Sequence, residues 1–275
     1  MDLKSKIILI SGPTASGKSN FAIQISKKLN GEIVNADSMQ VFKELKILTA
    51  RPKVKDYKNI KHHLYGFLSV KKNFSVGDWL KLTLKKINEI KKRKKVPIIV
   101  GGTGLYFKVL TEGLVKIPII PFKFRNKIRN LQRSIGQKKF FKKLTKLDPL
   151  AKNKIKKTDI QRSIRAYEVK LFTRRSIFEW FGKTKSKYPK KVFFKIYIDF
   201  PRTELLQKIS QRSIKMIKNG AILEVKNFLK LKIGADNTAN KVIGINEIRD
   251  FIDKKSNLSE LTEKISIKTR RYAKR

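Results

Sequence analysis

Short apolar runs alternate with amphipathic stretches through the first third of the chain. Residues 7–10 and 97–100 are short apolar runs that end directly in serine or glycine, and residues 32–35 begin another strand after Asn30 and Gly31. Continuous apolar sequence is typical of parallel strands that are buried on both faces. Residues 18–29 and 75–95 instead repeat their apolar side chains at helical spacing. This order predicts an α/β fold whose parallel sheet is flanked by helices.

The middle of the chain has a different pattern. Residues 118–191 contain few strand signals and many basic segments with helical spacing, and residues 192–198 then return to strand composition. Residues 204–219 read as a helix that ends before Gly220, and further helices follow to the end. We therefore expect a core made of residues 1–117 and 192–275, with residues 118–191 as an all-helical insertion. The helices expected in the insertion are 122–134, 138–147, 149–156 and 159–172.

Charge narrows the class of partner. The chain carries 67 Lys and Arg against 21 Asp and Glu, a formal net charge of +46. Such an excess favours a polyanion, because each phosphate contact releases counterions. Many of these lysines fit solvated helix faces equally well, so the charge favours nucleic acid without locating a site.

Cysteine and long apolar segments are both missing from the sequence. Without cysteine there is no disulfide, zinc–thiolate site or cysteine nucleophile. The first apolar run, 7–10, is too short for a signal peptide or a membrane span, and no other run reaches membrane length. We expect a cytoplasmic protein that works without a membrane.

A phosphate-binding motif lies between the first strand and the first helix. Its pattern is G-x-x-x-x-G-K-[ST], formed by Gly12, Pro13, Thr14, Ala15, Ser16, Gly17, Lys18 and Ser19. The glycines let backbone amides point at a phosphate, Lys18 neutralises it, and Ser19 can coordinate Mg²⁺. ATP and GTP are the usual ligands of this motif. The chain lacks an Asn-Lys-x-Asp segment for guanine and an apolar strand ending in Asp-Glu, so hydrolysis is not supported.

A carboxylate follows the second strand. Asp37 comes directly after residues 32–35, and residues 101–104 (Gly-Gly-Thr-Gly) follow the third strand. Ligands in open parallel sheets bind beyond the carboxyl ends of strands, so these groups should converge with the phosphate loop. Asp37 could act there as a base or hold Mg²⁺ through water. Asp37 or Ser38 could equally be a turn or helix cap.

Several segments together resemble the tRNA dimethylallyltransferase (isopentenyltransferase) family. The matching segments run in family order along nearly the whole chain, and they are residues 12–19, 35–41, 49–52, 62–64, 97–106, 159–169 and 269–275. The resemblance implies a nucleotide-kinase-like core with an inserted helical domain that binds tRNA. It also implies transfer of a dimethylallyl group from its diphosphate to the exocyclic amine of the adenosine 3′ to the anticodon, in tRNAs that read codons beginning with U. A monomer is expected.

The resemblance also assigns roles to single residues. Asp37 would be the base, Thr14 and Thr103 would contact substrate oxygens, and Lys18 with Mg²⁺ on Ser19 would stabilise the diphosphate leaving group. Arg212 would grip the same diphosphate. On the residues alone, Arg212 could also be a solvated helix charge.

Further family matches point to tRNA contacts. Ser38, Met39 and Gln40 would read the flipped adenosine. The segment that touches the anticodon stem-loop would be Gln161, Arg162, Ser163, Ile164 and Arg165, joined by Arg125. A solvated basic face is the alternative for these helices. Aromatic residues of the insertion could stack on bases, but their helical spacing favours core packing; they are Phe140, Phe141, Phe178, Trp180 and Phe181.

The chain departs from the family pattern at three places. Residues 42–48 contain no glycine, and Phe42 stands where the family has Tyr, so a changed loop shape is expected. Ile245 and Asn246 replace the usual Tyr and Lys or Arg. The chain ends at Arg275, before the aromatic and basic tail of its relatives, from which we expect weaker or altered tRNA binding.

Three rival functions remain open on the sequence. Prenyl transfer to a free adenine nucleotide would not need the basic insertion or residues 161–165. A small-molecule kinase would need an acceptor site for the γ-phosphate of ATP and typically an arginine-rich lid. A non-catalytic RNA-binding protein would not need intact Lys18, Asp37 and Thr103.

Overall fold

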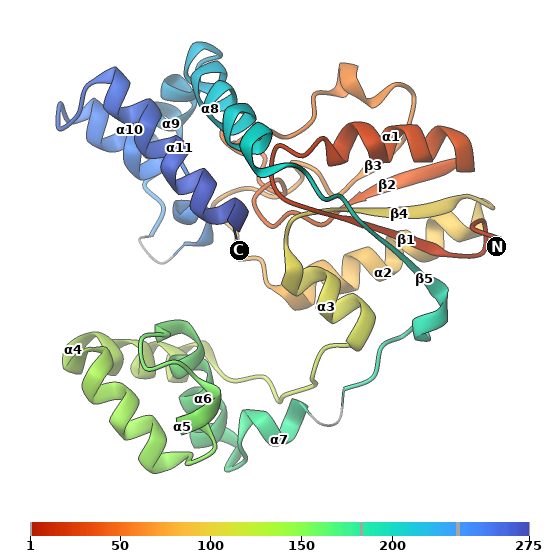
Figure 1. Ribbon diagram of the computed structural model, residues 1–275. Helices are drawn as coiled ribbons and strands as arrows, with labels where there is room; N and C mark the ends of the chain where they lie inside the picture. The colour runs from red at the N-terminus through yellow and green to blue at the C-terminus, as the bar shows by residue number, and fades with distance from the viewer. Residues whose placement is uncertain (1, 182–183, 235–236, 275) are drawn as a thin grey trace. The chain divides into compact units, whose positions relative to one another are not determined.

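The computed structural model describes residues 2–181, 184–234 and 237–274. Arg275, the last residue of the final matching segment, lies outside the described residues. The chain forms two compact units: Glu112–Lys187 is one, and the segments before and after it together form the other (Figure 1). The units are described separately below.

The first unit contains a five-stranded parallel sheet with the strand order β3-β2-β4-β1-β5. Its strands are β1 (Ile7–Ser11), β2 (Gly31–Asn35), β3 (His62–His63), β4 (Val96–Gly101) and β5 (Phe193–Tyr197). The apolar residues of β1 and β4 are buried, as continuous apolar runs predict. The α/β fold with a parallel sheet is therefore confirmed. The short edge strand β3 was not predicted, because two residues carry no periodicity.

Helices cover both faces of this sheet. Figure 1 shows α1 (Lys18–Leu29) on one face, and α2 (Val76–Lys92) with α3 (Gly104–Glu112) on the other. Helix α2 begins at a capping box, in which Ser75 Oγ accepts from Asp78 N and Ser75 N donates to Asp78 Oδ2. The sequence predicted α1 and α2 but not α3.

Four helices complete the first unit. They are α8 (Arg202–Lys218), α9 (Ala221–Lys230), α10 (Ile245–Ile252) and α11 (Leu258–Lys274). Their apolar faces share a core with the segment that lacks glycine, since Phe42, Leu45 and Leu48 are all buried there. Ile245 belongs to the same core and is fully buried, so this departure from the family pattern is a packing residue.

A carboxylate holds the segment without glycine. Glu224 of α9 accepts hydrogen bonds from the backbone amides of Lys46, Ile47 and Leu48, at 2.8–3.0 Å. Three converging amides form an anion-binding concavity, and here the anion is a side chain of the same unit. The segment therefore keeps a defined turn without glycine.

The second unit is helical in its described residues. It contains α4 (Phe122–Leu147), α5 (Ala151–Lys154), α6 (Ile160–Thr173) and α7 (Ile177–Phe181). Gly136 interrupts α4 with a φ of 72°, which matches the two separate helices that the sequence predicted. Phe140 and Phe141 are buried in this unit, so core packing is confirmed for both. Phe181 is 49 % exposed.

Across the residues that the structure describes, no helix combines the length and apolar character needed to cross a membrane.

Candidate active site

The phosphate loop connects β1 to α1 in a conformation that exposes its amides. Gly17 is the residue before α1 and has a φ of 82°, and Ala15 is also left-handed, with a φ of 65°. These angles turn the chain so that the amino end of α1, with its partial positive charge, faces the loop. The Ser16 hydroxyl is buried and has no hydrogen-bond partner among the described residues. The loop thus offers unused donors to an anion.

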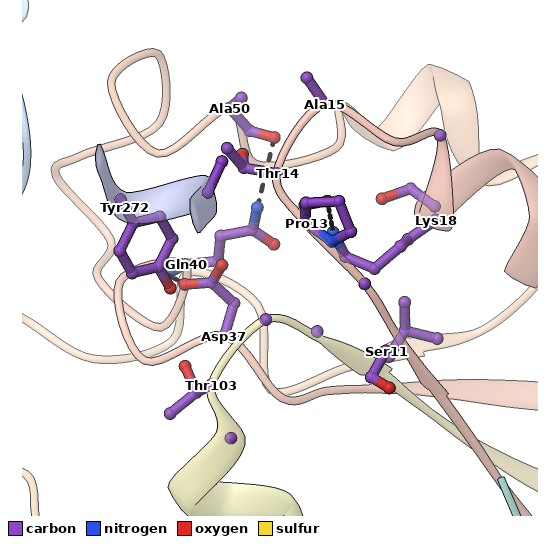
Figure 2. A pocket seen from close by; sticks show the side chains of 18 of the residues that line it. Ser11, Pro13, Thr14, Ala15, Lys18, Asp37, Gln40, Ala50, Thr103 and Tyr272 are labelled. Carbon is purple, nitrogen blue, oxygen red and sulfur yellow. Dashed lines mark hydrogen bonds between the residues drawn. The ribbon is translucent and has the colours of Figure 1, made fainter. Parts of the chain in front are cut away.

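Lys18 lies at the end of this loop, and its ammonium group hydrogen-bonds a backbone carbonyl rather than a carboxylate. Its Nζ donates to the carbonyl oxygen of Pro13 (Figure 2). Burial lowers the pKa of Lys18 to about 8; Asp37 acts in the opposite direction, and Arg212 lowers it further. A bound phosphate would restore the charge of a cation that its surroundings disfavour.

Arg212 reaches the same loop from α8, distant in sequence. Its Nη1 donates to the hydroxyl of Thr14 at 2.9 Å. Its Nε is buried, and no partner for it occurs in the described part of the chain. Burial lowers the pKa of Arg212. Arg212 is therefore engaged with the phosphate loop, and it is not a solvated charge on the helix surface.

Asp37 sits in a turn directly after β2. Its Oδ1 accepts from the amides of Met39 at 2.9 Å and Gln40 at 3.4 Å, and its own amide donates to Asn35 Oδ1 at 2.9 Å. One carboxylate oxygen therefore caps the turn, as one of the two sequence interpretations expected. No hydrogen bond joins the other oxygen, Oδ2, to any described residue, so it can still accept a proton.

Thr103 is held beside Asp37 by the end of β4. Its Oγ1 accepts from the amide of Ser38 at 3.0 Å, and its own amide donates to the carbonyl oxygen of Ala36 at 3.1 Å. Gly101 makes this approach possible, because a side chain there would collide with the Ala36 carbonyl. These two hydrogen bonds hold the chain after β2 against the chain after β4.

These groups line one cavity of about 750 Å³. It receives Gly12, Pro13, Thr14, Ala15, Gly17, Lys18 and Ser19 from the loop, together with Asp37, Ser38, Gln40, Thr103 and Arg212. Met39 is not among the lining residues, and neither is the buried Ser16. Figure 2 shows Asp37, Gln40 and Thr103 on one side of the cavity and Lys18 on the other. The convergence expected at the carboxyl edge of the sheet is thus present.

The side-chain amide of Gln40 is oriented by the backbone. Its Nε2 donates to the carbonyl oxygens of Thr49 at 3.0 Å and Ala50 at 3.4 Å. With the amide nitrogen fixed in this way, Oε1 remains as the acceptor.

Aromatic side chains also line the cavity, and no sequence pattern assigned them a role. They are Tyr65, Phe107, Tyr197 and Tyr272. Tyr272 comes from α11, and burial together with the nearby Asp37 carboxylate raises its pKa. It lies in the matching segment 269–275, which is the one signal that could have identified it. The others are brought in by tertiary structure.

The residues expected to contact tRNA from the insertion lie in the second unit. Gln161, Arg162 and Ile164 lie on α6, and Arg162 is 74 % exposed. Ser163 differs, because it is fully buried; its hydroxyl donates to Asp159 O at 2.6 Å and accepts from Gln137 Nε2 at 3.1 Å. Its hydroxyl is thus engaged within the unit.

Arg125 and Arg165 both lie next to Glu168. Glu168 is 1 % exposed, and Oε2 lies 3.4 Å from Arg125 Nε and 3.3 Å from Arg165 Nη1. Glu168 lies in the matching segment 159–169, but no role was assigned to it from the sequence. Burial of a carboxylate with paired arginines is visible only once the helices are packed.

A protein-only metal site is absent from the residues that the structure describes, which contain no group of three His, Asp or Glu side chains suited to one. Magnesium bound to phosphates usually takes one or two protein ligands and completes its shell with phosphate oxygens and water. Ser19, which lines the cavity beside the loop, suits that type of site.

Known proteins resemble this chain along its whole length. The family model for IPP transferase matches residues 40–275. A tRNA dimethylallyltransferase of Pelagibacter ubique (strain HTCC1062) is 60 % identical over 275 residues, covering 100 % of this chain and 88 % of that protein. One of Rickettsia bellii (strain OSU 85-389) is 43 % identical over 273 residues, covering 99 % and 86 %.

Solved structures agree with these sequence matches. A eukaryotic dimethylallyltransferase acting on tRNA aligns with a TM-score of 0.85 and 28 % identity, covering 98 % of this chain and 68 % of that one. The full-length tRNA isopentenylpyrophosphate transferase of Bacillus halodurans aligns with a TM-score of 0.68 and 29 % identity, covering 98 % and 84 %. With a phosphate loop, a free carboxylate oxygen and a helical unit in the same chain, these matches lead to one conclusion: the chain belongs to the IPP transferase family.

Proposed function

We propose that this protein transfers a dimethylallyl group from dimethylallyl diphosphate to the exocyclic amine of the adenosine 3′ to the anticodon, in tRNAs reading codons that begin with U, and releases diphosphate. One observation carries the proposal. A free carboxylate oxygen of Asp37 shares a cavity with two cations, Lys18 and Arg212, that form no ion pair within the described residues. The relatives named above support the same reaction.

The side of the cavity formed by the phosphate loop would stabilise the leaving group. The allylic carbon is already activated, so the barrier is set by the charge that develops on the departing diphosphate. The loop amides, Lys18 and Arg212 face that charge from fixed positions, and Thr14 is held by Arg212 at 2.9 Å. Bound Mg²⁺, held on the protein side by Ser19, would neutralise further negative charge on the diphosphate.

Proton removal falls to Asp37. The adenine amine is a poor nucleophile, and its proton becomes acidic as the new C–N bond forms. Asp37 Oδ2 can then accept the proton, while Oδ1 continues to hold the turn through Met39. Thr103, fixed by Ser38, would contact the reacting amine.

Base recognition would use the turn that follows Asp37. The target adenosine must leave the loop stack to enter the cavity. Gln40 Oε1, oriented by the carbonyl groups of Thr49 and Ala50, can accept a hydrogen bond from its amine. Ser38 and Met39 would contact the same base through their backbone. We propose that the helical unit holds the anticodon stem-loop with Gln161, Arg162, Ile164, Arg165 and Arg125, and that Ser163 supports α6 from within.

The domain boundaries are part of this proposal. A catalytic core of residues 1–117 and 192–275, related to nucleotide kinases, would carry the chemistry, and residues 118–191 would bind tRNA. Since one chain supplies every group of the proposed site, we propose a monomer that acts in the cytoplasm, where its tRNA substrate is found.

The test offers purified protein radiolabelled dimethylallyl diphosphate with tRNA, with AMP, or with neither. We expect label in tRNA alone. Label in AMP but not in tRNA would mean a nucleotide prenyltransferase instead, and the proposal would be wrong.

Asp37→Asn tests the base without disturbing the turn. Asparagine keeps an oxygen that can accept from Met39 N, but it cannot take a proton. We expect kcat to fall by about 10²- to 10⁴-fold, with tRNA affinity within a few-fold of wild type. Glu89→Gln, at a partly exposed position of α2, is the matched control for loss of one carboxylate. Full activity in Asp37→Asn would remove Asp37 as the base.

A further inference from the structure

A buried carboxylate in the helical unit holds three arginines at once. Glu168 Oε2 lies 3.4 Å from Arg125 Nε and 3.3 Å from Arg165 Nη1, and Oε1 lies 3.8 Å from Arg129 Nε. The carboxylate is 1 % exposed, whereas the three arginine side chains are 33–39 % exposed. The negative charge is therefore hidden and the positive charges reach the surface.

The arrangement follows from helix geometry. Arg125 and Arg129 are four residues apart on α4, so they share one face of that helix. Arg165 and Glu168 are three residues apart on α6, which packs against α4. Glu168 thus points between the two helices, where arginines from both can reach it.

The charges do not balance. Three guanidinium groups surround one carboxylate, which leaves an excess of two positive charges. An arginine has five N–H donors, yet Arg165 alone of the three makes a hydrogen bond to the carboxylate within the described residues. Glu168 Oε1 and Arg125 Nε are buried without hydrogen-bond partners there. One arginine would be enough to join the two helices through an ion pair with Glu168. The cluster therefore carries more positive charge than helix packing requires.

We propose that Glu168 is a positioning residue that gathers Arg125, Arg129 and Arg165 into one cationic cluster, ready to bind backbone phosphates of tRNA. The inference rests on the proposed function, and it adds Arg129 and Glu168 to the tRNA-binding groups. Without the carboxylate, three like charges repel one another and their long side chains spread. A phosphate would then have to order them at an entropic cost.

The sign of the effect separates this proposal from simple electrostatics. Removing a negative charge near RNA should tighten binding if only net charge matters. Removing Glu168 should weaken binding if the carboxylate positions the arginines. Glu168→Gln keeps the shape of the side chain and removes its charge, so it distinguishes the two.

The experiment measures tRNA binding by filter retention and steady-state kinetics, for wild type, Glu168→Gln, Glu168→Asp and Glu179→Gln. For Glu168→Gln we expect about a tenfold rise in both Kd and KM for tRNA, with unchanged kcat at saturating tRNA and unchanged KM for dimethylallyl diphosphate. The dependence of log Kd on log salt should become shallower by about 0.7 for each phosphate that the variant no longer binds. Glu168→Asp keeps the charge on a shorter side chain and should lie in between.

Glu179→Gln is the matched control. Glu179 is half exposed in the same unit, lies 3.9 Å from Arg175 Nε, and accepts from the Ser176 amide at 2.7 Å, a hydrogen bond that a glutamine oxygen can also accept. Its substitution also removes one negative charge, and we expect unchanged or slightly tighter tRNA binding. A purely structural role for Glu168 would lower the melting temperature without changing tRNA affinity or the salt slope.

Each outcome decides the proposal. Equal or tighter tRNA binding by Glu168→Gln would overturn it. If that variant does not fold, Glu168→Asp carries the test, and wild-type tRNA affinity in Glu168→Asp would overturn it. Absence of transfer by the wild type would instead refute the proposed function, since filter binding of tRNA does not depend on catalysis.

Discussion

Two groups of cations in this molecule are built in opposite ways. In the cavity of the α/β unit, Lys18 and Arg212 are partly buried and form no ion pair within the described residues. In the helical unit, Arg125, Arg129 and Arg165 share the buried Glu168 and are partly exposed. An unpaired cation facing a cavity suits one compact anion, whereas cations prearranged around a shared carboxylate suit a large one. The difference predicts that the two substrates respond differently to substitution, salt and pH.

Lys18→Ala should produce the largest separation between the two groups. The substitution removes the cation that faces the developing charge of the leaving group. We expect kcat/KM for dimethylallyl diphosphate to fall by about 10³-fold, with tRNA Kd unchanged in filter binding. A comparable loss of tRNA binding would show that the cavity cations also hold RNA, and the comparison would fail.

Arg212→Gln should act in the same direction but less strongly. Glutamine keeps a polar side chain but removes the positive charge, and it is too short to keep the hydrogen bond of Arg212 Nη1 to Thr14. We expect about a 10²-fold loss in kcat/KM for dimethylallyl diphosphate. Lys208→Gln, on the same helix but outside the cavity's lining residues, is the control and should stay near wild type. Equal losses in both variants would point to general charge on α8.

Salt should distinguish the groups without any substitution. If three phosphates contact the arginine cluster, raising monovalent salt from about 50 to 200 mM should raise the KM for tRNA roughly twenty- to fortyfold. The KM for dimethylallyl diphosphate should change by less than about threefold, because partly buried charges inside a cavity are screened less than surface charges. Parallel changes in both KM values would contradict the distinction.

Alkaline pH should affect the cavity alone, with the smallest effect. The pKa of Lys18 is lowered to about 8, chiefly by burial. Binding of the diphosphate needs the charged form, which is lost as pH rises through that value. We expect kcat/KM for dimethylallyl diphosphate to be about tenfold lower at pH 9 than at pH 7. Lys18→Arg should abolish this decline, since arginine stays protonated; a persisting decline would assign it to another group.

Local sequence patterns predicted the parts of the fold that depend on local physics. The continuous apolar runs became β1 and β4, and helical spacing gave α1 with its bounds at Lys18 and Leu29. The strand β3 has two residues and α3 follows a glycine-rich turn, so neither carries a usable period. Their places are set by the sheet edge and by stacking of Tyr106 on Trp79, at 4.1 Å between ring centroids.

The candidate site was predictable to the extent that it follows strand ends. The loop and Asp37 come directly after β1 and β2, so the rule for parallel sheets brings them together. Asp37 both caps a turn and provides a free acceptor, because Oδ1 accepts from Met39 N whereas Oδ2 has no hydrogen-bond donor among the described residues. Tyr197, Arg212 and Tyr272 come from β5, α8 and α11, far along the chain. The family resemblance pointed to Arg212, but the strand-end rule places none of the three at the cavity.

The sheet order has a consequence for synthesis of the chain. Strand β1 is made first, yet it lies between β4 and β5 in the sheet, and β5 begins only at Phe193. A ribosome must therefore translate the whole helical unit before the edge of β1 next to β5 can be covered. Arg212 is translated later still, so a nascent chain has the phosphate loop long before it has the arginine that completes the grip. During that interval the unpaired edge of β1 is the part of the chain most in need of a chaperone.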